Sequence, residues 1–534
     1  MQNLKNTKLL TPIELKLWFT SFFVLLLGFL PLIFNFIWGN HDWNPILRDN
    51  SLQGGFIEGR ITQYAFLQLF LEGKILPIIN TTLGFLIYSL AIVILATRFF
   101  EFQTSNIKLF IIITSITTLS YINEIIYFQF IVFSQLFWPL IVILSLICSK
   151  KATQSNFNKY TTCSTLLLYL SIAGYPASAN LFTTGAVLYL LYQYDYNNSC
   201  KQILKKVIPF AISLCIAFVF LYFSYAYLRA NNLMKDMYNN STSSISEILF
   251  KIPTILSLSI QSLLQPQPFF SLTYKIISFF IILLCITIYI TKSNIPTNFF
   301  IRLLFVIATF LAIKFSALLT QELETSYFPK RDPIAFMVRT DFYSIPCLLL
   351  FSLFFILKST HKLPQNITIF ASLILIIINI NQNLDYSKTQ IFGFKAETNL
   401  LNRVTNRIEG FPAFKPHNYY TVVQTGDVPL RSRYYQSKSF EKYGYYNKDV
   451  ALVRHWLPHE FYNFFSPTKF ALSNSSIHPM DINPKMISFL STKAETWPSP
   501  NSIYVNNKYA IVVISDEGRD MLKEQFKSLK RGHR

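Results

Sequence analysis

The chain has 534 residues, of which 52% are hydrophobic and only 14% are charged, and its formal net charge is +20. Soluble proteins have about 25% charged residues, so the composition argues against a soluble class and indicates that lipid surrounds much of the chain. No basic run interleaved with aromatic residues is present, so a nucleic-acid partner is not expected. The positive charge fits anionic membrane lipid or a phosphate-bearing ligand better.

Apolar runs long enough to cross about 30 Å of hydrocarbon recur from the N-terminus to residue 380. The full-length runs lie near 16–38, 76–97, 125–148, 177–194, 207–228, 272–291, 301–320, 341–357 and 364–380. Two shorter runs, 107–122 and 160–175, each lead after a brief polar break into a full-length run, which is typical of a tight helical hairpin. The sequence therefore predicts about eleven spans. The first run has no small-residue cleavage site, so we expect it to be retained as a helix.

Lysine and arginine predict how these spans are oriented, because cytoplasmic loops carry more of them. If the N-terminus is inside, the short loops on the inner side hold more Lys and Arg than the longer loops outside. This bias predicts a cytoplasmic N-terminus. An odd number of spans then places residues 381–534 on the outer side.

Three expected outer loops are long, 39–75, 229–271 and 321–340, and they hold most of the acidic residues outside the C-terminal region. Part of the first loop, "ITQYAFLQLFLEGK", is expected to form an amphipathic helix on the membrane surface. Its apolar residues at helical spacing are Ile61, Ala65, Phe66 and Leu69. Any chemistry is therefore expected to face outward.

The composition changes abruptly at residue 381 to a mixed, soluble pattern. "AETNLLNRVTNRIEG" has helical periodicity, "NYYTVVQTGD" predicts a strand and a turn, and "SIYVNNKYAIVVIS" predicts a hairpin with Asn506 and Asn507 in its turn. We therefore expect a membrane domain over 1–380 and a small α/β domain over 381–534. All six cysteines lie within or close to the apolar runs, so the C-terminal domain has no disulfide.

Several common chemistries have no motif in the sequence. It contains no phosphate-cradling glycine loop, zinc-spaced cysteines or HExxH, which argues against ATP-driven transport and zinc peptidase activity. His455 and His459 have helical spacing, but Pro458 between them is expected to break the helix, so no metal site is predicted. No cofactor is assigned, and a divalent cation remains open.

The stretch "GNHDWNPILRD", residues 39–49, follows the first run and gathers ionisable residues at the membrane edge. Asp42 lies beside Trp43, whose ring favours the interface, so its carboxylate is expected where lipid phosphate meets water. A carboxylate held there has the placement of a general base for a sugar hydroxyl. The alternative is a solvated acid that ends a helix. Asp49 and Glu58 are further acidic candidates in the same loop.

The expected outer loops also hold the matching cations: Arg48, Arg60, Lys330, Arg331 and Arg339. Arginine and lysine donors at headgroup depth can stabilise a phosphate leaving group as it gains negative charge. An ordinary contact with a lipid headgroup is the alternative for each of them.

Two turns at the expected outer face add polar candidates. "SIAGYPASANLF" places Gly174 and Tyr175 at a tip where small residues allow a close approach to a neighbour or ligand, although a tight turn needs the same residues. "YINEIIYFQF" adds Glu124, which could equally be a turn residue.

These stretches together resemble the type-two glucosyl transferases that decorate bacterial O-antigen. The resemblance rests on "HDW", "EGRITQYAFLQLFLEGKILPIIN", "SIAGYPASANLF" and "FMVRTDFYSIP" in the membrane part, and on "LLNRVTNRIEGFPAF", "YYTVVQTGD" and "NSIYVNNKYAIVVIS" in the soluble part. It covers nearly the whole chain, although each motif is short.

The resemblance implies a GT-C-like fold, mainly α, in which a polytopic helical domain is followed by a small periplasmic α/β domain. It implies a polyprenyl-phosphate-linked hexose as donor and a lipid-linked or surface glycan as acceptor, at the bacterial inner membrane. The acidic position of the family falls on Asp42 and its Gly-Arg pair on Gly59 and Arg60. The family often has two adjacent acids where this chain has His41 and Asp42, so Asp49 remains open as the second carboxylate.

The sequence therefore favours an inverting glycosyl transfer in which Asp42 is the base and Arg60 and Arg339 hold the donor phosphate. Two rivals remain open. A transporter or flippase needs ionisable residues deep in the membrane, and Lys314 is the only deep one that the sequence predicts. A non-catalytic assembly factor would leave the charges of the first loop unexplained.

Overall fold

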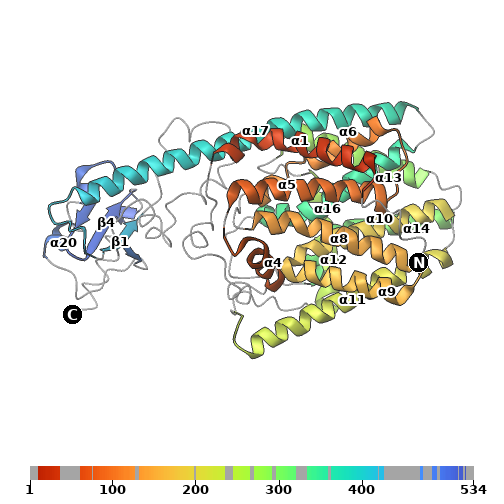
Figure 1. Cartoon of the computed structure of the whole chain (residues 1–534), viewed down its shortest axis with the longest axis horizontal. Coiled ribbons are helices and arrows are strands. Elements are labelled where there is room, and N and C mark those ends of the chain that lie inside the picture. The colour runs from red at the N-terminus through yellow and green to blue at the C-terminus, as the bar shows by residue number, and fades with distance from the viewer. Residues whose placement is uncertain are drawn as a thin grey trace. The chain divides into compact units, whose positions relative to one another are not determined.

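The computed structural model is mostly helical, with a small sheet near the C-terminus (Figure 1). Apart from a few isolated positions after residue 514, it describes residues 10–35, 60–74, 76–126, 131–197, 200–234, 245–264, 270–291, 296–319, 333–358, 362–418, 420–425, 470–472, 484–489 and 494–514. These residues form two compact units that meet within one long helix, between Asp385 and Tyr386. Each unit is described by itself.

A helix lies in each of the eleven runs that the sequence predicts as spans. The first part of the bundle comprises α1 (Pro12–Phe34), α4 (Ile61–Leu71), α5 (Pro77–Ile94) with its π-helical end η2 (Leu95–Phe99), α6 (Asn106–Thr117), α7 (Ile122–Ile126), α8 (Val132–Ala152), α9 (Phe157–Gly174), η3 (Pro176–Ser178) and α10 (Ala179–Asn197). The second part comprises α11 (Cys200–Ala230), α12 (Ile245–Leu264), α13 (Leu272–Thr291), α14 (Pro296–Ile313), α15 (Phe315–Leu319), α16 (Pro333–Leu357) and α17 (Lys362–Glu409).

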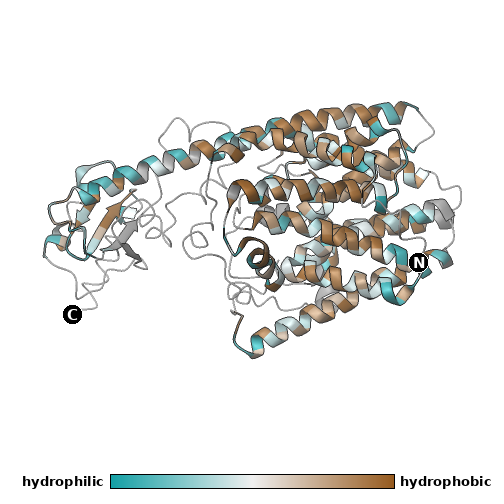
Figure 2. Cartoon of the chain, in the orientation of Figure 1, coloured by the Kyte–Doolittle hydropathy of each residue, from teal (hydrophilic) through white to brown (hydrophobic). Residues whose placement is uncertain are grey.

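Seven of the described helices are long and apolar enough to cross a membrane. Apolar residues dominate the bundle (Figure 2), and many of them face outward: Phe23, Phe223 and Phe370 are each more than half exposed. Such a surface is unfavourable in water and is expected where lipid is the solvent. The chain is therefore mostly helical with helices that suit a membrane, whereas the total of eleven spans and their orientation stay predictions.

Two helices depart from the sequence expectations. Helix α12 lies in the stretch that was expected as a long outer loop, and it buries Ile255 while Phe250 is 84% exposed. Helix α17 does not end near residue 380 but continues to Glu409, through the polar stretch in which the composition changes. Local composition did not predict α12, and for α17 it predicted the two ends of the helix but not the continuous helix between them, because amphipathic and polar sequences also form helices when one face packs.

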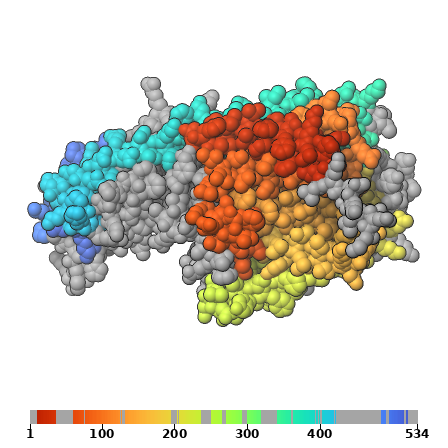
Figure 3. Space-filling view, viewed as in Figure 1, coloured from red at the N-terminus to blue at the C-terminus, as the bar shows by residue number. Residues whose placement is uncertain are grey.

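Antiparallel neighbours bring several helix ends together at one end of the bundle. Arg98, at the end of α5, pairs with Glu14 in the first turn of α1, with Nε to Oε1 at 2.8 Å. Lys150, at the end of α8, donates to the Phe99 carbonyl at 2.7 Å and pairs with Glu101 at 2.8 Å. We call this end of the bundle the Glu14 end. Helix α1 and the helices beside it form the red and orange surface in Figure 3.

The helix ends at the Glu14 end carry lysines that the sequence predicts on the inner side. Lys358, after α16, donates to the Tyr192 hydroxyl on α10. Lys206, on α11, donates to the Gln193 side chain on α10. These contacts agree with helices that run up and down the bundle. We call the opposite end, at which α5 and α16 begin and α9 ends, the Asp341 end.

Helices α8 and α9 form a hairpin that is packed through small side chains. Asn156 caps α9 by accepting a hydrogen bond from the Lys159 amide at 3.1 Å. The Ser145 and Ser164 hydroxyls lie 2.9 Å apart, and the Cys148 and Cys163 sulfur atoms lie 3.6 Å apart. Small residues let the two backbones approach closely, as is usual between membrane helices.

The C-terminal unit contains a four-stranded sheet in the order β2-β1-β4-β3. Its strands are β1 (Tyr420–Thr425), β2 (Phe470–Leu472), β3 (Ile503–Val505) and β4 (Tyr509–Val513), accompanied by α20 (Pro484–Ser488) and η7 (Pro500–Ser502). Strand β1 is parallel to β2 and β4, whereas β3 and β4 are antiparallel. The Asn506 side chain accepts from the Lys508 and Tyr509 amides, which closes the β3–β4 turn. The predicted strand in "NYYTVVQTGD" and the predicted hairpin are confirmed.

Candidate functional site

Most of the candidate residues lie outside the described residues. These are Asp42, Arg48, Asp49, Glu58, Lys330 and Arg331, together with the side chains of Glu124 in α7 and Arg339 in α16. Arg60 and Tyr175 are described, and the structure brings them together. The site is therefore built outward from this pair.

Arg60 immediately precedes α4, and its guanidinium carbon lies 5.3 Å from the centre of the Tyr175 ring. Tyr175 lies between α9 and η3 with an extended backbone, and it is 9% exposed. Half-buried Arg60 thus presents a positive charge against the face of an aromatic ring, an arrangement that stabilises a cation away from bulk water. Because Arg60 also carries planar N–H donors, it can bind a phosphate or a carboxylate.

A buried chain of polar side chains continues from Tyr175 into the bundle. The Tyr175 and Tyr343 rings lie 5.6 Å apart. The Tyr343 hydroxyl, on α16, donates to Gln135 Oε1 on α8 at 2.5 Å, and Gln135 Nε2 donates to Gln63 Oε1 on α4 at 3.1 Å. We call Arg60, Gln63, Gln135, Tyr175 and Tyr343 the Arg60 network. It joins four parts of the chain that are far apart in sequence.

Some buried donors at the Asp341 end have no hydrogen-bond partner within the described part of the chain: Gln63 Nε2, Trp138 Nε1 and Asn180 Nδ2. A polar group buried in lipid without a partner costs several kcal/mol. Donors kept there despite that cost are available to the oxygen atoms of a ligand or to water.

Gly174, the last residue of α9, makes the close approach that the sequence predicts for this turn. A Cβ atom at this position would lie 2.3 Å from Trp138 Cζ2 and 3.0 Å from Thr62 Oγ1. Thr62 also donates to the Leu170 carbonyl at 2.7 Å. Only glycine therefore allows α9 to hold α4 against α8, and this packing fixes the position of Arg60.

Lys314, the deep cation in the sequence, lies between α14 and α15 and is 3% exposed. Its ammonium donates to Asp341 Oδ1 at 2.5 Å and to Thr340 Oγ1 at 2.8 Å, both on α16. Asp341 is fully buried. Asp341 is not among the residues predicted from the sequence, although an acid beside an apolar run long enough to span is a signal for a buried partner.

Helix α4 confirms the helix that the sequence predicts in the first loop, and its place on the membrane surface stays a prediction. The structure buries Gln63, Tyr64, Leu67 and Leu71 and leaves Leu69, on the predicted apolar face, 77% exposed. Gln63 faces inward, where Gln135 donates to it.

Glu72 ends α4 in the left-handed region with φ 52°, and it is fully exposed. Its carboxylate accepts a hydrogen bond from Lys74 at 2.7 Å. This hydrogen bond and the charge of Lys74 hold the pKa of Glu72 below its ordinary value.

Neither a metal nor a known family can be attached to this site by comparison. Among the described residues, no group of three His, Cys, Asp or Glu side chains is arranged to hold a metal ion. The sequence matches no model of a known protein family and no curated protein. The functional argument therefore rests on the geometry of the Asp341 end.

Proposed function

We propose that the protein is a membrane glycosyltransferase of the bacterial inner membrane. It moves a hexose, glucose in the first instance, from a polyprenyl-phosphate carrier to a lipid-linked or surface glycan such as O-antigen. In this proposal the N-terminus is cytoplasmic, the C-terminal unit is periplasmic and the reaction takes place at the outer face.

One observation carries the proposal. The segments that begin α4, join α9 to α10 and begin α16 are three of the stretches on which the resemblance to O-antigen glucosyl transferases rests. In the structure they meet in the Arg60 network, through the Arg60–Tyr175 contact and the Tyr343–Gln135–Gln63 hydrogen bonds. An arginine beside buried amide and phenol groups, at one end of an apolar bundle, suits a substrate with a phosphate, a sugar and a lipid tail.

The proposed chemistry divides the roles between two parts of the same loop. Arg60 donates hydrogen bonds to the donor phosphate and stabilises the charge that this phosphate gains as the bond to the sugar breaks. Asp42, or Asp49 in its place, accepts the proton of the acceptor hydroxyl as that hydroxyl attacks the anomeric carbon. The configuration at that carbon is inverted because a single displacement occurs.

The test uses full-length protein in nanodiscs, with a polyprenyl-phosphate glucose donor and a glycan acceptor. Transfer is expected from the lipid donor and not from UDP-glucose. Arg60→Gln should lower the rate by about a hundredfold or more, the usual effect of removing one donor that stabilises the transition state. Lys74→Gln is the matched control, because Lys74 follows the same helix but pairs with exposed Glu72. Faster turnover with UDP-glucose would contradict the proposal.

Asp42 and Asp49 are separated by paired substitutions. If Asp42 is the base, Asp42→Asn should abolish transfer while donor binding remains, because the amide cannot accept the proton. Asp49→Asn should then remain active. The reverse result would assign the base to Asp49, and activity in both variants would exclude each of them.

A transporter or flippase of a lipid-linked glycan is the second candidate. The buried Lys314–Asp341 pair favours it, since ionisable residues inside a membrane bundle often mark a transport path. Liposomes that contain the protein and a lipid-linked glycan, but no acceptor, separate the two functions. Movement of the glycan between leaflets without transfer would select this candidate.

A further inference from the structure

Three buried charges meet where α13, α14 and α16 come together at the Asp341 end. Lys275 lies in the first turn of α13, Lys314 follows α14, and Asp341 lies on α16; their exposed fractions are 3%, 3% and 0%. Asp341 contacts Lys314 directly, and Lys275 is within electrostatic range of both. The two ammonium groups exceed the one carboxylate, so with all three ionised these described side chains have a net charge of one positive unit.

The cluster is not saturated by its own side chains. Lys275 donates to the Ser262 carbonyl at 2.5 Å and lies 4.8 Å from the centre of the Phe270 ring, but no carboxylate hydrogen bond to it is present among the described residues. Asp341 Oδ2 is buried and has no hydrogen-bond partner within the same part of the chain. Burying an ion costs several kcal/mol unless partners repay it, so both groups favour a ligand that supplies an anion and a hydroxyl donor.

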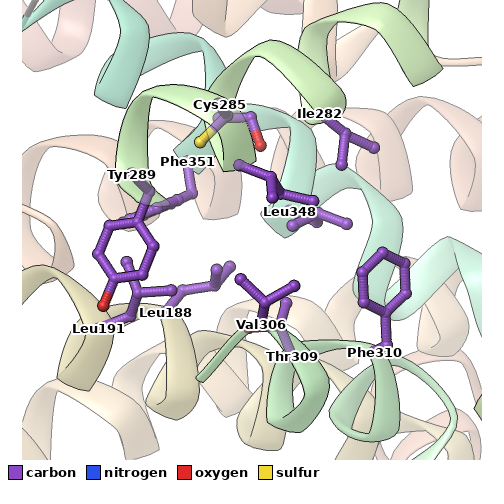
Figure 4. Close-up of a pocket in the computed structure, with 12 residues that line it drawn as sticks. Leu188, Leu191, Ile282, Cys285, Tyr289, Val306, Thr309, Phe310, Leu348 and Phe351 are labelled. Atoms are coloured by element: carbon purple, nitrogen blue, oxygen red, sulfur yellow. The ribbon is translucent and has the colours of Figure 1, made fainter. Parts of the chain in front are cut away.

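An apolar, partly open cavity lies farther along the same helices, and the centre of a water-sized molecule can reach about 30 Å³ of it. Figure 4 shows its side chains around this space, most of them apolar, including Leu188, Leu191, Ile282, Val306, Phe310 and Leu348.

The spacing along each helix aligns this cavity with the charges. Ile282 and Leu348 each lie seven residues after the charged residue of their helix, and Phe310 lies four residues before Lys314. Seven residues are two helical turns, roughly 10 Å, so the charges and the cavity share one face of each helix.

We propose that α13, α14 and α16 form a binding site for a phosphate-bearing lipid. Its phosphate lies against Lys275 and Lys314, a hydroxyl on or next to that phosphate donates to Asp341 Oδ2, and its hydrocarbon chain occupies the apolar cavity. One negative charge balances the cluster, and either a phosphodiester or a singly ionised phosphate monoester supplies it. The apolar chain accounts for the cavity, which offers little to a free phosphate.

This site is separate from the Arg60 network, although Asp341 and Tyr343 belong to the same turn of α16. Residues two apart on a helix point to different sides, so Tyr343 faces α8 while Asp341 faces Lys314. The inference does not rest on glycosyl transfer. Binding is measured without an acceptor, so a protein that binds the lipid and transfers no sugar fails only the proposed function.

The experiment measures binding to full-length protein in detergent by native mass spectrometry and by the shift in Tm. The probes are a polyprenyl phosphate, the matching polyprenol, phosphatidylglycerol and inorganic phosphate. The polyprenyl phosphate should bind at least about tenfold more tightly than the polyprenol, as expected when a charged group finds a charged partner. Inorganic phosphate should bind most weakly. If phosphatidylglycerol binds as tightly as the polyprenyl phosphate, and Lys275→Met abolishes that binding, the site is supported and its ligand is an ordinary membrane phospholipid.

Two variants with matched controls locate the ligand. Lys275→Met removes the charge that has no carboxylate hydrogen bond among the described residues, so it should lower the affinity of the polyprenyl phosphate to that of the polyprenol. Lys206→Met, at the Glu14 end, should not. Val306→Phe fills the cavity and should weaken both lipids, whereas Ile307→Phe, 38% exposed on the same helix, should not. Unchanged binding in both test variants, or equal binding of polyprenol and polyprenyl phosphate to the wild type, would overturn the proposal.

Discussion

The Glu14–Arg98 and Asp341–Lys314 ion pairs lie at opposite ends of one helix bundle and differ in how completely they are bonded. Both Glu14 oxygens are occupied, because they accept from the Thr11 amide, the Thr97 hydroxyl and two Arg98 nitrogens at 2.8–3.0 Å. The Arg98 side chain is 39% exposed. Asp341 is fully buried, yet Oδ2 has no partner among the described residues.

This difference separates a structural ion pair from a candidate binding site. Glu14 and Thr11 also form a reciprocal capping box at the start of α1, so the carboxylate caps the helix, pairs with Arg98 and has no hydrogen-bonding capacity left. Asp341 retains an acceptor, and Lys275 nearby adds charge that Asp341 alone does not balance. The unused hydrogen-bonding capacity of an ionisable group inside a membrane bundle is therefore a better sign of a binding site than the mere presence of the group.

The largest expected effect comes from breaking the buried pair. Lys314→Met leaves Asp341 buried and unpaired, so it should lower the free energy of unfolding by about 3–5 kcal/mol. The double variant Lys314→Met with Asp341→Leu should recover most of this loss, because an apolar pair carries no desolvation cost. Chemical unfolding in detergent measures both. A double variant as unstable as the single one would show that the pair does more than neutralise charge.

The next effect concerns the packing that positions the Arg60 network. Gly174→Ala forces a methyl group against the rigid Trp138 ring, so it should destabilise the fold by about 1–3 kcal/mol. Gly185→Ala is the control, because the closest atom to its Cβ, at 2.7 Å, would be the far end of the flexible Leu146 side chain, and Phe99 lies at an ordinary contact distance of 3.7 Å. The Tm values of the two variants are compared. A smaller decrease in Tm for Gly174→Ala than for Gly185→Ala would contradict the close approach of Gly174 to Trp138.

A smaller effect is expected at the Glu14 end. Glu14→Gln keeps one acceptor but loses the two-point contact with Arg98, so it should cost about 1–2 kcal/mol of unfolding free energy. Because Arg98 reaches water, it is not left stranded as Lys314 would be without Asp341. Lipid binding should remain at the wild-type level. Loss of binding in this variant would erase the distinction between the two ends.

The exposed Glu72–Lys74 ion pair is expected to have the smallest effect on stability. Lys74→Gln should leave Tm unchanged at neutral pH, since exposed ion pairs contribute little. The lowered pKa of Glu72 means that any contribution is present above the ordinary pKa of glutamate and is lost as the pH falls through the lowered value. A Tm difference between wild type and variant that persists at the lowest pH would assign Lys74 a different partner.

The sequence predicts the elements of this fold better than their partners. Runs of apolar residues identify helices because lipid forces the backbone to satisfy its own hydrogen bonds, and Asn506 identifies the β3–β4 turn. Helix α12 was missed since its apolar residues share one face. The burial of the Gln63 side chain could not be predicted, because its hydrogen-bond partner Gln135 is 72 residues away and hydropathy does not reveal which polar side chains bond to each other.

For the candidate site, too, the sequence predicts individual residues better than their contacts. Arg60 and Tyr175 were identified separately from their loops, and only the structure brings them within 5.3 Å. Lys314 was recognised as a deep cation, but its partner lies 27 residues farther along, across residues that the structure does not describe. Asp42 and Asp49 remain predictions.

The sulfur atoms of Cys148 and Cys163, 3.6 Å apart between α8 and α9, give the native chain a built-in cross-linking reporter. A mild oxidant such as a small-molecule disulfide should join them without any engineered residue, and peptide mapping would then verify how the two helices are aligned. The native cysteines must also be taken into account when cysteine labelling is used to determine the orientation of the protein in the membrane. Cys163 and Cys215 are exposed on the bundle surface, so a thiol reagent that crosses the bilayer would modify them and obscure an introduced cysteine unless both are first replaced by serine.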